Sequence, residues 1–99
     1  MPLRIELRDR GTVIDGVEEW WDGVESVLAD SDDRYPILDS ISPYGDVTIG
    51  SDRLPDLEVE SRDLARHATG DVRVLLLRIA DLCQRAAAGT GAQLRFDGD

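Results

Sequence analysis

Residues 3–14, with the sequence LRIELRDRGTVI, decide the fold class that we expect for this chain of 99 residues. Leu3, Ile5 and Leu7 alternate with charged residues, and this period of two predicts a strand with one buried face. A short turn containing glycine follows, and residues 12–14 are β-branched throughout, which predicts the returning strand. The chain is therefore expected to begin with a β-hairpin.

Directly after the hairpin, residues 15–29 are predicted to form a helix. Asp15 is a favourable N-cap, and Glu18 three residues later completes a capping-box pattern. Core packing is expected for Trp20, Trp21 or both, whereas an indole left exposed would be a candidate interface anchor. The apolar positions of this stretch fall on one helical stripe: Val17, Trp20, Trp21, Val24, Val27 and Leu28.

Further along the chain, the patterns predict a helical turn over residues 35–41, a strand over 47–49, a helix over 61–68, a helix over 71–88 and a strand over 93–96. Residues 51–60 are expected to be irregular, and Gly70 is expected to end the helix before it. These elements predict an α+β fold. Its small, mostly antiparallel sheet combines the N-terminal hairpin with the C-terminal strand, with helices packed on one face. We expect one domain over residues 1–99.

The charge of the chain restricts its partners. There are 21 acidic residues and 11 arginines, which give a net charge of −10. This charge opposes binding to nucleic acid and to anionic membranes, and it favours fast association with a basic protein.

The single Cys83 excludes an internal disulfide, and no apolar signal segment or long apolar run is present, so we expect a cytoplasmic protein.

No motif for catalysis, metal binding or a cofactor stands out. The cluster over residues 30–33 is acidic. An EF-hand loop starting at Asp30 would need an oxygen ligand, a glycine and a glutamate where Arg34, Tyr35 and Ile41 stand. His67 has no nucleophile at a recognisable spacing, and Cys83 falls on an apolar stripe. We therefore expect no catalytic residue, no metal, no cofactor and no enzymatic activity.

The sharpest functional hypothesis is a partner-binding surface in the acidic middle of the chain. Aromatic and spaced acidic side chains there could meet Arg or Lys on a basic partner: Tyr44, Asp46, Asp52, Asp56, Glu58 and Glu60. The alternative is a solvated surface that only maintains solubility. A second hypothesis makes the chain an accessory or homo-oligomerising subunit that uses Val74 and Leu77. A third is a small metal- or ligand-binding domain.

The segments Tyr35-Pro36-Ile37-Leu38 and Pro43-Tyr44-Gly45-Asp46 resemble a small family of uncharacterised bacterial proteins with a PYGD(T)-type segment. Val47 stands where that pattern commonly has Thr, and the resemblance extends loosely over residues 35–99. It implies an apolar turn, two helices and a final strand, and it implies no activity.

Size and electrostatics together predict a non-catalytic inhibitor or immunity-type protein that covers a basic surface, such as a nuclease active site.

Overall fold

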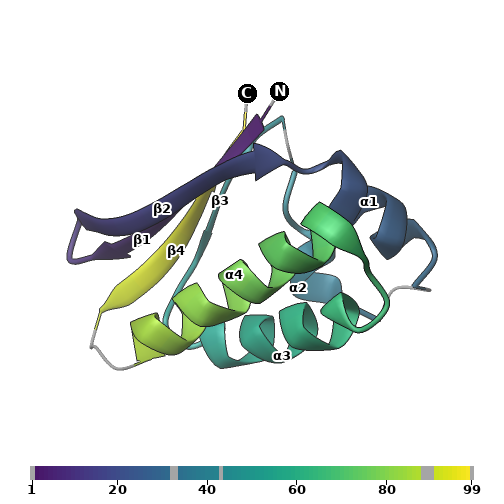
Figure 1. Cartoon of the computed structure of the whole chain (residues 1–99). Helices are drawn as coiled ribbons and strands as arrows, with labels where there is room; N and C mark the ends of the chain where they lie inside the picture. Colours follow the sequence, from purple (N-terminus) through teal and green to yellow (C-terminus); the bar gives the residue numbers. More distant parts are fainter. Residues whose placement is uncertain (1, 32–33, 43, 88–90, 99) are drawn as a thin grey trace.

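The computed structural model describes residues 2–31, 34–42, 44–87 and 91–98. Within these ranges the strands join one antiparallel sheet in the order β2-β1-β4-β3, and the helices cover one of its faces (Figure 1). The predicted α+β fold is confirmed. The elements are β1 (Pro2–Asp9), β2 (Thr12–Trp20), α1 (Asp22–Ala29), α2 (Pro36–Asp39), β3 (Asp46–Ile49), α3 (Leu54–Ala65), α4 (Gly70–Ala87) and β4 (Ala92–Asp97).

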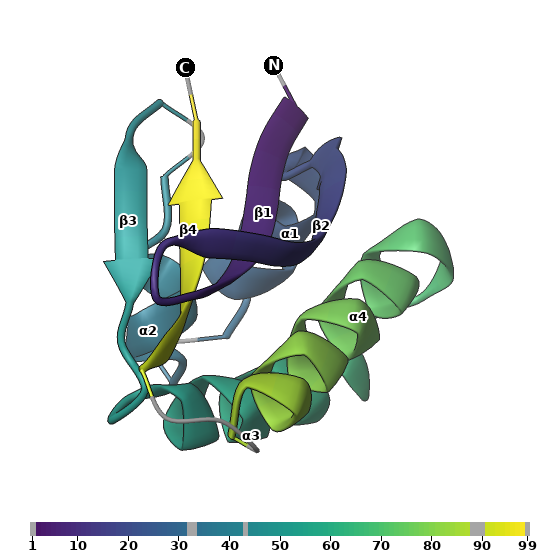
Figure 2. The same cartoon turned by 90° about the vertical axis from the view of Figure 1, so that its left-hand side faces the viewer.

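The N-terminal hairpin forms as predicted. Leu3, Ile5 and Leu7 of β1 are buried against the helices, and the charged residues between them face outward. Arg10 and Gly11 take positive φ values of 53° and 84°, which allow the tight reversal into β2. Since β1 also pairs with β4, it lies inside the sheet, and Figure 2 shows β2 and β3 at the two edges.

The helix predicted over residues 15–29 is wrong in its first half. Residues 15–20 continue β2, which pairs with β1 from Asp9↔Thr12 to Pro2↔Trp20, and the helix α1 begins only at Asp22. Pairing with β1 and contacts with α4 override the local helical pattern. Asp15 accepts hydrogen bonds from Arg78 and Arg85 of α4, so its carboxylate joins two distant elements instead of capping a helix.

The acidic start predicted as irregular is also helical. α3 runs over Leu54–Ala65, with a proline in its first turn. Its buried stripe includes Ser61, whereas Val59 is 68% exposed. Because the polar Ser61 is inside and the apolar Val59 is outside, the apolar residues of this stretch do not form a regular helical stripe in the sequence. Gly70, predicted to end the helix over 61–68, instead stands at the start of α4 with a φ of 61°.

The remaining elements follow the prediction. α2 is the single helical turn expected between residues 35 and 41, β3 contains residues 47–49, and β4 lies beside the hairpin as expected. α4 covers the predicted helix up to Ala87, and its predicted last residue, Ala88, lies outside the described residues. No helix in the described ranges is long and apolar enough to cross a membrane.

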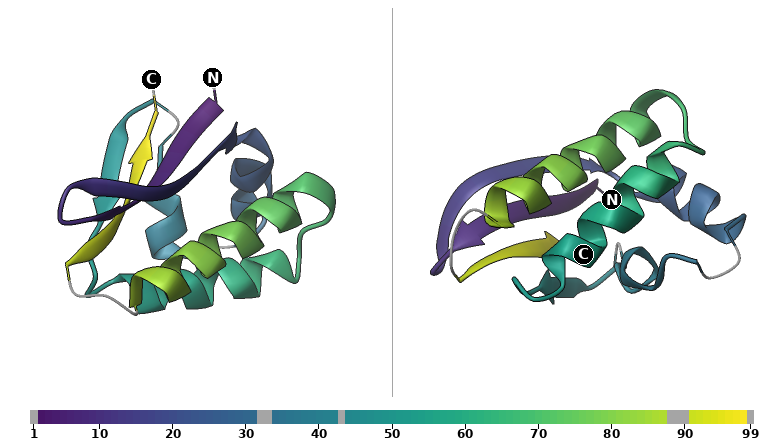
Figure 3. Two further views of the ribbon diagram at one scale, coloured as in Figure 1. Left: turned by 60° about the vertical axis from the view of Figure 1, so that its left-hand side comes forward. Right: turned by 90° about the horizontal axis from the view of Figure 1, so that it is seen from below.

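The core lies between the sheet and the four helices, and α3 and α4 pack side by side beneath it (Figure 3). Trp21 is its largest buried side chain, and its ring lies edge-on to Phe96, with 6.2 Å between the ring centroids. At Gly23, a Cβ atom would lie 2.4 Å from a methyl group of Val72, so the absence of a side chain there allows α1 to approach α4 closely.

Replacing Ser61 with alanine is expected to stabilise the protein. The hydroxyl of Ser61 is fully buried in α3 and has no hydrogen-bond partner among the described residues. Removing an unsatisfied hydroxyl and adding the better helix former should raise the free energy of unfolding by about 1 kcal/mol. Chemical denaturation measures this change. Ser31→Ala is the control, because the Ser31 hydroxyl is also buried but donates to the Val27 carbonyl at 2.7 Å. A Ser61→Ala protein no more stable than the wild type would contradict the assignment.

Candidate protein-binding surface

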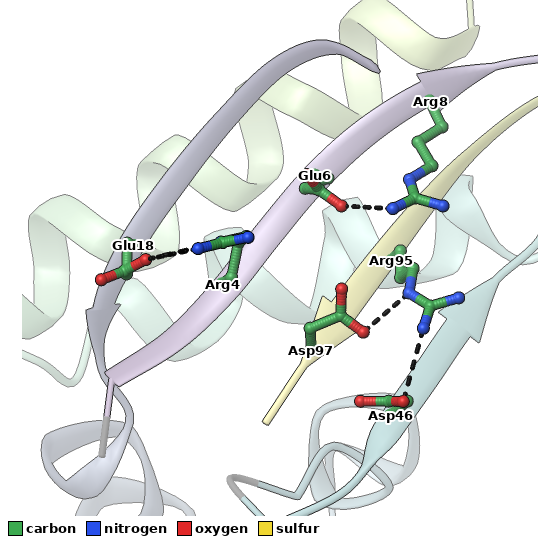
Figure 4. A network of polar contacts seen from close by, with 7 residues as sticks. All are labelled: Arg4, Glu6, Arg8, Glu18, Asp46, Arg95 and Asp97. Carbon is green, nitrogen blue, oxygen red and sulfur yellow. Dashed lines mark hydrogen bonds and ion pairs between the residues drawn. The ribbon is translucent and has the colours of Figure 1, made fainter. Parts of the chain in front are cut away.

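The outer face of the sheet is covered by an ion-pair network (Figure 4). Arg95 of β4 lies at its centre and contacts Asp97 at 2.7 Å and Asp46 at 3.4 Å. The hydrogen bond to Asp97 raises the pKa of Arg95. Burial acts to raise the pKa of Asp97, but the hydrogen bond and the positive charge of Arg95, with smaller contributions from Asp46 and Arg8, together hold it below its usual value. Seven charged residues from all four strands take part: Arg4, Glu6, Arg8, Glu18, Asp46, Arg95 and Asp97.

This network leaves little free charge on the sheet. Three arginines lie among four carboxylates, so the seven side chains sum to −1. Asp46, one of the predicted partner-binding residues, already pairs with Arg95. The negative charge available to a partner must therefore be concentrated elsewhere.

Half of the net charge of the sequence lies in the segment that carries α1 and α2. Residues 21–44 contain six Asp or Glu and one Arg, a net charge of −5 out of the chain's −10. Four of these acids lie in the described part of the chain and form no ion pair with any other described residue: Asp22, Glu25, Asp30 and Asp39. The surface of α1 and α2 is therefore strongly and locally negative.

A groove of about 430 Å³ opens between α1 and the connection from α2 to β3, and we call it the α1–α2 groove. Tyr44 contributes to it and is 79% exposed, the most exposed of the large apolar side chains in the described ranges. Trp21 also lines it, and its Nε1 has no acceptor among the described residues. The groove is formed by Trp21, Glu25, Leu28, Ala29, Asp39, Ile41, Ser42 and Tyr44.

This composition suits one long cationic side chain. The methylene groups of an arginine or lysine could lie on Leu28 and Ile41, while the charged end meets the two groove carboxylates, Glu25 and Asp39. The exposed ring of Tyr44 adds a surface for a cation–π contact.

The structure does not gather the six predicted partner-binding residues into one surface. Tyr44 and Asp52 lie beyond opposite ends of β3. Asp56 lines a separate hollow of about 460 Å³ with Val59, on α3. Glu58 pairs with Arg62 at 3.1 Å, also on α3.

Glu60 has a structural position. Its carboxylate accepts hydrogen bonds from the backbone N–H groups of Ile37 and Leu38, both at 3.1 Å, at the start of α2. Burial raises the pKa of Glu60 against these two donors, and the charges of Asp39 and Asp56 raise it further. Its carboxylate is thus occupied within the fold.

Sequence reasoning missed Glu25 and Asp39 as candidate site residues. The available signal was the absence of any basic residue between positions 21 and 33, beside an adjacent Trp pair. The two tryptophans differ in exposure: Trp21 is buried in the core, and Trp20 is 59% exposed. Trp20 ends β2 at the same end of the sheet as Tyr44, so two exposed aromatic side chains share that end.

The other candidates for chemistry are not brought together. His67 is exposed beside Asp30 and Arg34, around a hollow of about 250 Å³. Burial raises the pKa of the Cys83 thiol to about 12, so the thiol is protonated at neutral pH. Within the described ranges, no three His, Cys, Asp or Glu side chains are placed to hold a metal ion. Val74 and Leu77 are 66% and 39% exposed on α4.

Comparison with known proteins found no match to this chain among protein-family models, curated protein sequences or solved structures.

Proposed function

We propose that the protein is an acidic, non-catalytic binding module that captures a basic protein through the α1–α2 groove. The observation that supports this best is the pair of carboxylates in the groove, Glu25 and Asp39, neither of which forms an ion pair with a described residue. They belong to residues 21–44, which hold half of the net charge of the sequence. The groove adds an apolar floor and an exposed tyrosine to that charge.

The net charge of the chain and the α1–α2 groove have different effects on binding. A net charge of −10 draws a basic partner in from a distance and raises the association rate, in a way that added salt weakens. The groove acts at contact, where an aromatic side chain and a desolvated carboxylate slow dissociation. A protein that covers a basic catalytic surface, as an inhibitor or immunity-type protein does, needs both properties.

The test compares two variants that remove the same charge from different places. Glu25→Gln/Asp39→Asn alters the groove, and Asp52→Asn/Asp56→Asn alters exposed acids near the start of α3. Each variant and the wild type serve as bait in an extract of the native host, and the association and dissociation rates of each captured basic protein are then measured with purified components. We expect the groove variant to raise Kd by about 10–100-fold, mainly through faster dissociation.

The α3 variant is expected to lower the association rate by about two- to threefold and to leave dissociation unchanged. Equal effects of both variants would show that charge alone acts and that the groove has no part. A wild-type bait that retains no basic protein at low salt would overturn the proposed function itself.

A further inference from the structure

One face of α4 carries exposed apolar and charged side chains. Arg73, Val74, Leu77 and Asp81 are all exposed, and at 100° per residue they fall within an arc of about 100°. Neither Arg73 nor Asp81 forms an ion pair with a described residue. We call these four residues the α4 ridge.

Contacts with two neighbouring elements hold α4 in place. Along one side of the α4 ridge, Arg78 and Arg85 bind Asp15 of β2. Beyond its C-terminal end, Gln84 accepts a hydrogen bond from Arg62 of α3 at 3.3 Å. Figure 3 shows α4 lying along α3. The α4 ridge is therefore a face without ion pairs to the described residues, on a helix that is fixed in place.

The charges of the α4 ridge are complementary to themselves. Arg73 lies four residues before Leu77, and Asp81 lies four residues after it. If two α4 helices pack antiparallel around a twofold axis at Leu77, each Arg73 stands opposite the Asp81 of the other copy. The contact then contains two identical ion pairs around an apolar centre, as an isologous interface requires.

We propose that the α4 ridge binds a second copy of this chain, with the two α4 helices antiparallel and Leu77 against Leu77. The ridge carries one positive and one negative charge, so it offers no net attraction to the basic partner proposed for the α1–α2 groove. Beside it, a hollow of about 200 Å³ gives room for a side chain of the second copy. It is lined by the apolar Val17, Val74 and Leu75 and by the charged Glu19, Asp71 and Arg78. This interface is independent of the proposed function.

The affinity and the register of this dimer have different sources. Exposed ion pairs contribute little free energy, so the burial of Val74 and Leu77 must supply most of the affinity. Like charges placed face to face are unfavourable, so Arg73 and Asp81 decide which register is allowed. One helix pair is a small interface, and we expect Kd in the range of about 1–100 µM.

Sedimentation of the full chain over a concentration series tests the proposal. Wild-type protein is expected to dimerise, and Leu77→Asp is expected to be monomeric at every concentration. Arg73→Asp and Asp81→Arg each place like charges together twice, so each should raise the Kd of the homodimer by tenfold or more. Mixing these two variants restores both ion pairs, so the mixture should form a heterodimer about as tight as the wild-type dimer.

The mixing experiment also shows that neither variant has simply failed to fold. A wild-type protein that stays monomeric up to about 1 mM would overturn the proposal. A dimer that persists in both charge variants, or a mixture that remains monomeric, would overturn the antiparallel register. Binding of a basic protein at the α1–α2 groove should be unchanged by Leu77→Asp, so the two proposals succeed or fail separately.

Discussion

Trp21→Ala is expected to lower the free energy of unfolding by about 3–5 kcal/mol, the largest loss from any single substitution considered for this protein. Trp21 is fully buried, packs edge-on against Phe96 and forms part of the α1–α2 groove. For a domain of this size, such a loss should lower the melting temperature by about 15 °C or more. Thermal unfolding followed by circular dichroism measures it.

The neighbouring residue supplies the control for this prediction. Trp20→Ala removes the same side chain from a position that is 59% exposed, and it should change the free energy of unfolding by about 0.5 kcal/mol or less. Trp21→Phe should fall between the two, because it retains an aromatic ring against Phe96 and removes the indole N–H that has no described acceptor. Similar losses in Trp20→Ala and Trp21→Ala would contradict the burial assigned to each ring.

The pair of tryptophans also marks where sequence reasoning succeeded and where it failed. Strict alternation in β1 and in β4 predicted both strands, because one face of each is buried and the other is charged. Residues 15–20 fitted a helical stripe, and only the pairing with β1 and the contacts of Asp15 with α4 decided for a strand. Local sequence contains neither contact.

The prediction for the region of α3 failed for a different reason. Its pattern becomes regular only when Ser61 is placed inside and Val59 outside, against the usual preference of both residues. The candidate site had the same difficulty. Composition correctly drew attention to Tyr44 as an exposed aromatic residue in an acidic region, but it could not show that Arg95 already pairs with Asp46. Nor could it show that α2 brings Asp39 to the groove that Glu25 also lines.

Glu60→Ala is expected to lower the free energy of unfolding by about 1–3 kcal/mol, because it leaves the N–H groups of Ile37 and Leu38 without their acceptor at the start of α2. Glu60→Gln keeps one acceptor oxygen and removes the charge, so it isolates the effect of ionisation. Chemical denaturation of both variants and of the wild type, repeated between pH 4 and pH 8, measures the two contributions separately.

The direction of the pH effect follows from the raised pKa of Glu60, which burial causes first and the charges of Asp39 and Asp56 increase. A carboxyl group with a higher pKa in the folded state stabilises the fold fully below its unfolded pKa, near 4.5, and loses that contribution as the pH rises through the folded value. The stability of the wild type relative to Glu60→Gln should therefore fall as the pH rises. The groups with lowered pKa values, such as Asp63 and Asp97, are present in both proteins and cancel in this difference.

Asp39→Asn should shift this fall in relative stability to lower pH, since it removes a negative charge next to Glu60. A difference that stays constant with pH, or that grows as the pH rises, would show that Glu60 is not held in the partly buried position that caps α2.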